Sequence, residues 1–390
     1  MKKLRSLLVG GLVLVLALSL VAGGCAKAVP EGAAEEEIAA LESKLAAEKS
    51  KVSSLEDDVS DLEKEITALK KPAEVIELKF SSWCSRGSFY FDDIYVEFAQ
   101  NINDMSGGRI EVSTYGAGEV AAAGEVFEAL RTGMLDIGNP WPSYYKGVVP
   151  EGELEGTVLG GLQNLQEVET LFWLRGWVDI LRDDVYAPLD LYYLGPNPCD
   201  AGYRIVSRNP ITSLADIEGL LVRAVPPVST LLDNLGAQVV YVPWGEQYTA
   251  MATGTIDAAV YGDFPDTRDL HMHEFAPYHM DPPLAGYTNA NFLVNMDVWD
   301  SLTEDLQDIL QVACWENGRY SAIVGMDKML GAWTEIHAEG AEVTYLSQED
   351  AMTLRLAEME LLDELGATSA TMGKLVKIYK DFMVELGYLE

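Results

Sequence analysis

The stretch that decides the fold runs from Cys199 to Pro265 and opens with CDAGYRIVSRNPITSLADIEGLLVRAVPP. Its second part, LGAQVVYVPWGEQYTAMATGTIDAAVYGDFP, begins at Leu235. Short apolar segments alternate here with helical patterns of roughly ten residues. Such alternation is typical of parallel strand–helix units, in which ligand crevices form where strands end and helices begin.

Four side chains of this stretch stand at the expected ends of strands or starts of helices. They are Arg204, Arg223, Trp244 and Tyr261. Arginine pairs with carboxylates through two parallel hydrogen bonds, and aromatic rings offer apolar surface to the rest of a ligand. The stretch therefore predicts a crevice that holds a small carboxylate.

The composition limits the classes of protein that need considering. The 390 residues include 62 acidic and 27 basic side chains, a formal net charge of -35. The chain is 48% hydrophobic and long enough for two domains with their own cores. So acidic a chain repels nucleic acid and anionic lipid surfaces, which argues against both as partners. A locally basic pocket can still bind an anion.

Residues 1–24 have the layout of an export signal, with a basic start, MKKLR, and the apolar run SLLVGGLVLVLALSLVA. Gly23 and Gly24 then precede Cys25, as in the bacterial lipobox, whose cysteine is lipidated and becomes the mature N-terminus; Ala22 stands where leucine is usual. The alternatives are an ordinary secreted protein and an uncleaved anchor. In each case the remainder is expected outside the cytoplasmic membrane.

Residues 35–71 carry a heptad repeat that only Glu48 interrupts. Its apolar positions are Ile38, Leu41, Leu45, Val52, Leu55, Val59, Leu62, Ile66 and Leu69. Charged and small residues fill the other positions, a pattern typical of a solvated coiled coil that Pro72 would end. We expect residues 25–73 to form a stalk, which either oligomerises through this repeat or acts as a solvated spacer.

A globular pattern begins at residue 74. VIELKFSSW, GGRIEVSTYGAG and the end of GEVFEALRTGMLDIG are expected strands separated by helices, an order that favours a parallel sheet. Trp83 and Trp141 follow such strands, so we expect them to line a pocket. YTNANFLVN is expected to return to this sheet. One long helical run follows, with Ser301 as its expected N-cap.

Three cysteines remain besides Cys25. Cys314 lies in a helical pattern and is expected to be a buried apolar residue. Cys84 and Cys199 each follow an expected strand, and the sequence leaves open whether they pair in a disulfide.

Residues 74–390 resemble the extracytoplasmic solute receptors of TRAP transporters, the tripartite ATP-independent periplasmic systems of the DctP type. The resemblance rests on GYR at 202–204, ITSLADIEGLLVR at 211–223, LGAQVVYVPWGEQYTAMATGTIDAA at 235–259 and WDSLTEDLQDIL near the long helix. It implies an α/β, two-domain periplasmic-binding-protein-like fold with crossing hinge strands and a long spanning helix. Receptor domain I is expected over 74–200 plus 288–325, and domain II over 201–287 plus 326–390.

The resemblance also implies a function. Such a receptor is not an enzyme and needs no cofactor; it closes around a small organic acid and delivers it to a TRAP permease. Arg223 falls at the family's principal carboxylate-binding arginine and Arg204 at a second arginine near the ligand. The other implied ligand contacts are Trp244, Tyr261, Trp83 and Trp141.

One departure concerns metals. The 2-oxoacid branch of the family often has Glu-Trp after the last strand to serve a bound cation. Val260 and Tyr261 stand there in this chain, so a metal-assisted site is not predicted. The aromatic residues favour a ligand with some apolar surface over a small dicarboxylate.

Three alternatives belong to other classes. A zinc-binding lipoprotein would use His271 and His273 on one face of a strand, together with Glu274 and His279, although their spacing matches no strong zinc signature. An exported enzyme finds no support in a nucleophile elbow, a P-loop or a dinucleotide fingerprint. A sensory receptor would bind the same ligand, so this chain alone does not separate it from a transport receptor.

Overall fold

The computed structural model describes residues 31–69, 75–162 and 164–389. The chain divides into two compact units, Met1–Ala73 and Glu74–Glu390. None of the helices in these described ranges is both long enough and apolar enough to cross a membrane. The expected export signal and Cys25 lie outside the described residues.

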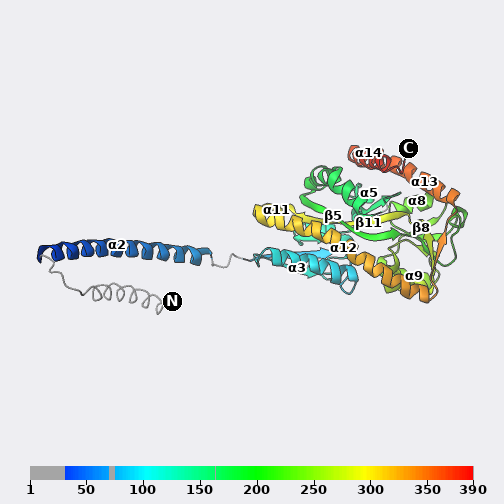
Figure 1. Cartoon of the computed structure of the whole chain (residues 1–390). Coiled ribbons are helices and arrows are strands. Elements are labelled where there is room, and N and C mark those ends of the chain that lie inside the picture. Colours follow the sequence, from blue (N-terminus) through cyan, green and yellow to red (C-terminus); the bar gives the residue numbers. More distant parts are fainter. Residues whose placement is uncertain (1–30, 70–74, 163, 390) are drawn as a thin grey trace. The chain divides into compact units, whose positions relative to one another are not determined.

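The described part of the first unit is a 39-residue helix, α2 (Glu31–Leu69), drawn in blue in Figure 1. Its predicted apolar seam is exposed, as expected of a helix whose apolar face has no partner within the chain; its described members are Leu41, Leu45, Val52, Leu55, Val59 and Leu62. The predicted helix is therefore confirmed, whereas coiled-coil pairing stays a prediction.

The second unit contains two mixed sheets. The first has the order β2-β1-β3-β11-β4, with β5 also paired to β11. Its strands are β1 (Ile76–Ser82), β2 (Ile110–Tyr115), β3 (Ile137–Asn139), β4 (Thr157–Leu159), β5 (Leu191–Tyr203) and β11 (Ala285–Asn295). Strands β2, β1 and β3 are parallel, as the sequence predicted, and β11 returns antiparallel to β3.

The second sheet has the order β12-β10-β6-β9-β7-β8. Its strands are β6 (Val206–Ser207), β7 (Leu221–Arg223), β8 (Gln238–Val240), β9 (Ala258–Ala259), β10 (Tyr278–Asp281) and β12 (Glu342–Tyr345). Strands β8, β7 and β9 are parallel, so the strand–helix units predicted for the central stretch are confirmed. We call the parts of the chain around the two sheets the first lobe and the second lobe.

Helices cover both sheets. Those of the first lobe include α3 (Val96–Met105), α4 (Val126–Arg131), α5 (Gly152–Gly156), α6 (Leu165–Glu169) and α7 (Trp177–Ile180). Those of the second include α8 (Val228–Asn234), α9 (Gln247–Ala252) and α10 (Phe264–Asp269). They are followed by α11 (Met296–Ser301), α12 (Glu304–Ala338), α13 (Gln348–Gly366) and α14 (Ala370–Glu385).

Strands β5 and β11 and helix α12 connect the lobes. The two strands pair in the first sheet; β5 is followed in the chain by β6, and β11 is preceded by β10, both of the second sheet. Helix α12 packs on α3 and β5 near one end and on α10 near the other, and Figure 1 shows it running from beside α3 toward α9. Leu310 and Cys314 of α12 lie in the first lobe's core, and Ala332 and Ile336 pack beside Phe264. The predicted long spanning helix is confirmed.

Two local predictions were wrong. Ser301 does not cap the long helix, because it ends α11; Leu302 is extended, and Thr303 is the N-cap of α12. His271 and His273 do not lie on a strand: His271 is in the left-handed region with φ 54°, and a 3-10 turn follows over Met272–Glu274. In both places a short turn breaks a pattern that looked continuous in the sequence.

The cysteines Cys84, Cys199 and Cys314 are buried thiols, so the disulfide that the sequence left open is not formed. The thiol of Cys199 donates to the backbone carbonyl of Asn197 at 3.2 Å.

Candidate ligand-binding cleft

Arg223 is the last residue of β7 and lies between two parallel neighbours, opposite Val240 of β8 and Ala259 of β9. Its side chain is buried, with 2% exposure for the residue. Nε donates to the carbonyl of Val242 at 3.0 Å, and Nη1 donates to the carbonyl of Val260 at 2.8 Å. Both carbonyls stand just beyond the neighbouring strands. The guanidinium is therefore fixed in place by the sheet itself.

No carboxylate lies within ion-pair distance of Arg223 in the described part of the chain. Of the five N–H donors of a guanidinium, the two carbonyls occupy two. A buried cation without a counter-ion is costly, so the fold maintains an anion-binding group at this point. The alternative of a surface ion pair does not describe this arginine.

Eight residues enclose a small cavity at Arg223. They are Trp83, Trp141, Tyr144, Tyr203, Arg223, Val225, Trp244 and Tyr261. The first three follow β1 and β3 of the first sheet, whereas Val225, Trp244 and Tyr261 follow β7, β8 and β9 of the second. We call this cavity, whose free volume is about 10 Å³, the inner compartment. Five of the six predicted ligand contacts thus meet in one cavity between the lobes.

The aromatic walls are held by contacts behind them. The rings of Trp83 and Trp141 meet edge to face at 5.1 Å, and Trp83 Nε1 donates to Tyr95 Oη at 3.2 Å. The Tyr261 hydroxyl is 2.9 Å from the hydroxyl of Thr267 in α10. Trp244 Nε1 is buried and has no hydrogen-bond partner among the described residues, which leaves a donor for a ligand.

Tyr144 is a further wall residue that the predicted contacts did not include. Burial raises the pKa of its phenol, and the charge and hydrogen bond of the Arg223 guanidinium oppose that rise. The phenol oxygen of Tyr144, in the first lobe, thus contacts the guanidinium of Arg223, in the second lobe. The signal in the sequence was weak, because Tyr144 is separated from the expected strand by the Trp141-Pro142 turn.

The structure places Arg204 apart from Arg223. Its guanidinium donates to the carbonyl of Gly202 at 2.9 Å and lies 3.4 Å from Asp281. The guanidinium also lies over the ring of Phe264 in a cation–π contact, 5.3 Å from the ring centroid. Arg204 lines a different cavity of about 370 Å³, so the two predicted arginines do not converge.

The histidines do not assemble the alternative zinc site. The ring of His273 lies 6.2 Å from that of His271, but its Nε2 is 2.8 Å from Glu339, the residue that follows α12, and His271 is exposed. His279 is buried against Phe264, and this burial lowers the pKa of the imidazole to about 3. Within the described ranges, no three histidine, cysteine or acidic side chains are grouped so as to hold a metal ion.

The two sheets with a cleft between them define a two-lobed binding protein. Residues 80–368 match the family model described as bacterial extracellular solute-binding protein, family 7, named DctP. Because this match covers most of the chain, the protein belongs to the DctP family, the solute-binding proteins of TRAP transporters. It is a binding protein rather than an enzyme.

Individual relatives share low sequence identity with this chain. A monocarboxylate 2-oxoacid-binding periplasmic protein of Nostoc sp. is 25% identical over 295 residues, 74% of this chain and 79% of that protein. An ectoine-binding periplasmic protein of Halomonas elongata is 23% identical over 60% of this chain and 68% of that protein.

Solved structures confirm the fold. A TRAP solute-binding protein of Colwellia psychrerythraea with bound calcium and pyruvate superposes with a TM-score of 0.74 at 22% identity, covering 80% of this chain and 95% of that one. One from Rhodoferax ferrireducens with bound malonate gives 0.70 at 21% identity, covering 80% and 100%.

Proposed function

We propose that this protein is the receptor of a TRAP transporter for small organic acids and that Arg223 binds the ligand's carboxylate. One observation carries the proposal: a buried arginine without a described acidic partner stands at the strand ends of one sheet and faces aromatic side chains from the other. The names of relatives point the same way, since they bind 2-oxoacids, pyruvate or malonate.

Binding requires the lobes to move. The free volume of about 10 Å³ at Arg223 accommodates roughly one water molecule, which is less than a carboxylate needs. The residues of the two lobes therefore separate on ligand entry and then close on it. Closure expels water, which strengthens the pairing between guanidinium and carboxylate. The loaded receptor then delivers its ligand to the permease.

We assign domain I to 74–200 plus 288–325 and domain II to 201–287 plus 326–390. In this scheme Trp83 and Trp141 of domain I and Trp244 of domain II pack on the ligand, and Tyr261 supplies a polar edge. Arg204 would act as a second contact only if closure separated it from Asp281.

We further propose a periplasmic or cell-surface location with a lipid anchor at Cys25. Helix α2 then serves as the stalk, and its exposed seam pairs with the same helix of another copy.

The test of the site is the substitution Arg223→Ala. Two charge-assisted hydrogen bonds are lost, so we expect the affinity for a carboxylate ligand to fall about a hundred-fold or more. Isothermal titration calorimetry with pyruvate, malonate, pyroglutamate and larger acids measures the change. Arg223→Lys retains the charge but not the paired donors, and we expect an intermediate loss.

Arg204→Ala is the matched control, since it removes a partly buried arginine of the same lobe from a different cavity. We expect a loss of less than ten-fold from Arg204→Ala. Unchanged affinity in a folded Arg223→Ala protein, checked by its thermal transition, would contradict the assignment.

A further inference from the structure

The inner compartment adjoins a larger one. Trp83, Tyr144 and Trp244 line both, and the larger cavity, which we call the outer compartment, has a volume of about 360 Å³. This volume lies within the usual range for small-molecule sites, roughly 300–1,000 Å³. A ligand whose carboxylate meets Arg223 therefore has space for its remaining atoms in one direction.

The two compartments differ in charge. Arg223 is the one charged residue that lines the inner compartment, and no charged residue is among those described as lining the outer one. The residues that line the outer compartment include the aromatic side chains of Tyr90 and Tyr241 and the small side chains of Ala117 and Ala123. Together the compartments offer a single cation and otherwise neutral surface.

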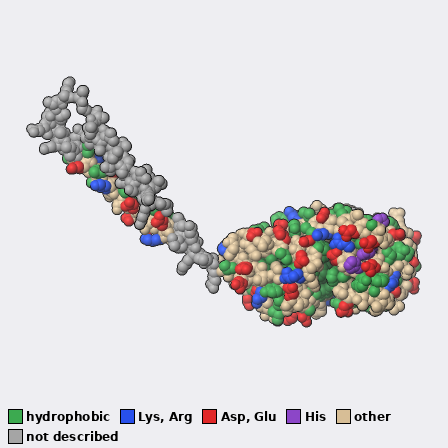
Figure 2. Space-filling view, turned by 90° about the horizontal axis from the view of Figure 1, so that it is seen from below, with side chains coloured by type: hydrophobic (Ala, Val, Ile, Leu, Met, Phe, Trp, Pro, Cys, Tyr) green, Lys and Arg blue, Asp and Glu red, His purple; other side chains and the backbone are tan. Residues whose placement is uncertain are grey.

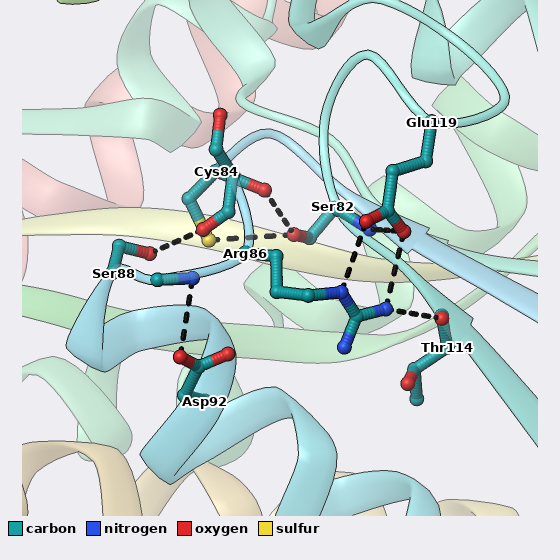
Figure 3. Close-up of polar contacts among 10 residues, drawn as sticks. Ser82, Cys84, Arg86, Ser88, Asp92, Thr114 and Glu119 are labelled. Carbon is teal, nitrogen blue, oxygen red and sulfur yellow. Dashed lines mark hydrogen bonds and ion pairs between the residues drawn. The ribbon is translucent and has the colours of Figure 1, made fainter.

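Nearby charges are held away from this surface. Figure 3 shows Arg86, in the loop after β1, joined to Glu119 by Nε at 2.9 Å and Nη2 at 3.1 Å, with Nη2 also donating to the carbonyl of Thr114 at 3.0 Å. Arg86 lines a neighbouring cavity of about 730 Å³, which shares Ser85, Ser88 and Trp244 with the outer compartment and whose walls also include Arg268 and Glu335. The outer compartment thus remains neutral beside a highly charged neighbour.

Building on the proposed function, we infer that the ligand class is a monocarboxylate with an uncharged, largely apolar body of about the size of a ring. The body stacks between aromatic side chains in the outer compartment while its carboxylate pairs with Arg223. A second carboxylate would enter neutral surface without a cation, and an ammonium group would find no described acidic partner there. Pyruvate would leave the outer compartment to water and bury little apolar area.

Four related probes separate these features, measured by calorimetry on the purified protein. Phenylacetate has the inferred form; acetate removes the ring, phenylmalonate adds a carboxylate, and phenylalanine adds an ammonium group. Burying a phenyl ring favours phenylacetate over acetate by about ten- to a hundred-fold. We expect phenylmalonate and phenylalanine to bind at least about ten-fold more weakly than phenylacetate.

A substitution in the outer compartment tests the charge argument directly. Ala123→Lys adds a cation to its wall, and we expect it to tighten phenylmalonate selectively. Ala123→Met has similar length without charge and is the control, in which the order of the four probes should persist. The inference is supported if phenylmalonate binds more tightly to the Ala123→Lys protein and not to the Ala123→Met protein.

The outcomes distinguish the inference from the function on which it rests. If acetate or phenylmalonate binds as tightly as phenylacetate, and Arg223→Ala still abolishes binding, the ligand class is wrong while the receptor function stands. If none of the acids binds and Arg223→Ala changes nothing, the proposed function fails as well.

Discussion

The proposed role of Arg223 depends on the surroundings of its side chain. Two backbone carbonyls hold the guanidinium, so little side-chain freedom remains to be lost when a ligand binds. An arginine on a flexible surface loop would have the same charge but not this orientation. The same carbonyl contacts are the reason we expect lysine to be a poor replacement, since an ammonium group cannot bridge both carbonyls and still present paired donors.

Glu155 is a second residue with an unusual environment, in the core of the first lobe. It is fully buried; Tyr186 donates to one carboxyl oxygen at 2.5 Å, and Asn291 donates to the other at 2.7 Å. Burial raises the pKa of Glu155 to about 7, against the opposing effect of these hydrogen bonds. The folded protein therefore retains a proton on this carboxyl that the unfolded chain releases at lower pH.

The pH dependence follows from this sign. Because the pKa of Glu155 is higher in the folded state, protonation of this carboxyl stabilises the folded protein. The stabilisation is complete below the pKa of the unfolded chain, near 4.3, and is lost as the pH rises through about 7. Glutamine stays neutral at every pH, so we expect the Glu155→Gln protein not to lose stability in this way as the pH rises. Between pH 5 and 8 the free energy of unfolding of the wild type should fall by about 1–3 kcal/mol relative to the variant.

Urea unfolding at each pH measures the difference. Burial also raises the pKa of Glu358 to about 8, but that group is common to both proteins and cancels in the comparison. Glu97→Gln, at an exposed site, is the control and should follow the wild type. Parallel pH profiles for Glu155→Gln and the wild type would refute the argument.

Among the elements, the loops that follow β1 and β2 are packed closely at the cleft. The backbone of Gly116 approaches the loop after β1, and a Cβ atom there would lie 2.5 Å from the backbone nitrogen of Arg86. The Arg86–Glu119 ion pair joins the same two loops. The strand ends that line the outer compartment are therefore positioned by contact between loops, not by the sheet alone.

Gly116→Ala tests this packing. The added methyl group forces the loops apart, and we expect the free energy of unfolding to fall by about 1–3 kcal/mol, with weaker ligand binding. Gly124→Ala is a matched control, because Gly124 lines the same compartment but its Cβ would meet nothing within 4 Å. Urea titration and calorimetry check both; equal effects of the two substitutions would show that the close approach is not what matters.

The proposed pairing of helix α2 between copies of the chain can be tested separately. Replacing Leu55 and Leu62 of the exposed seam with Lys places charge where two helices would pack. We expect the purified protein to change from an oligomer to a monomer in sedimentation equilibrium. Ser53→Lys with Ser60→Lys, off the seam, should leave the oligomer intact. A wild-type protein that sediments as a monomer would support the spacer interpretation instead.

At the scale of the whole molecule, the proposed mechanism requires lobes that move on ligand binding but remain connected. Strands β5 and β11 and helix α12 link the two lobes, while the cleft residues come from loops at the strand ends. Acidic and basic side chains are interspersed over the face of the globular unit in Figure 2. The chain thus combines a strong net negative charge with a cleft that contains the buried cation of Arg223.

The proposed lipid anchor at Cys25 is also testable. Lipidation requires the thiol of Cys25, so Cys25→Ser should move the protein from the membrane fraction to the soluble fraction and abolish incorporation of labelled palmitate. Cys84→Ser, at a buried thiol, is the control and should stay membrane-bound. A Cys25→Ser protein that remains in the membrane would favour the uncleaved anchor.

Much of the fold was predictable because its signals are local. The strand that ends at Arg223, the parallel order of β1, β2 and β3, and the long helix all follow from apolar periodicity and turn residues within a few dozen positions. Boundaries were harder. The break between α11 and α12 depends on the extended backbone of Leu302, which helical periodicity does not reveal.

The sequence by itself determined that one strand ends at Arg223 and that Trp83 and Trp141 follow two others, because side-chain alternation and turn residues are properties of neighbouring positions. Only the tertiary structure decided which strand ends face one another. It separated Arg204 from Arg223, brought Tyr144 onto the arginine and left the outer compartment without charge. These facts depend on loops from two sheets that lie far apart in the chain, and their convergence is set by the packing of whole lobes.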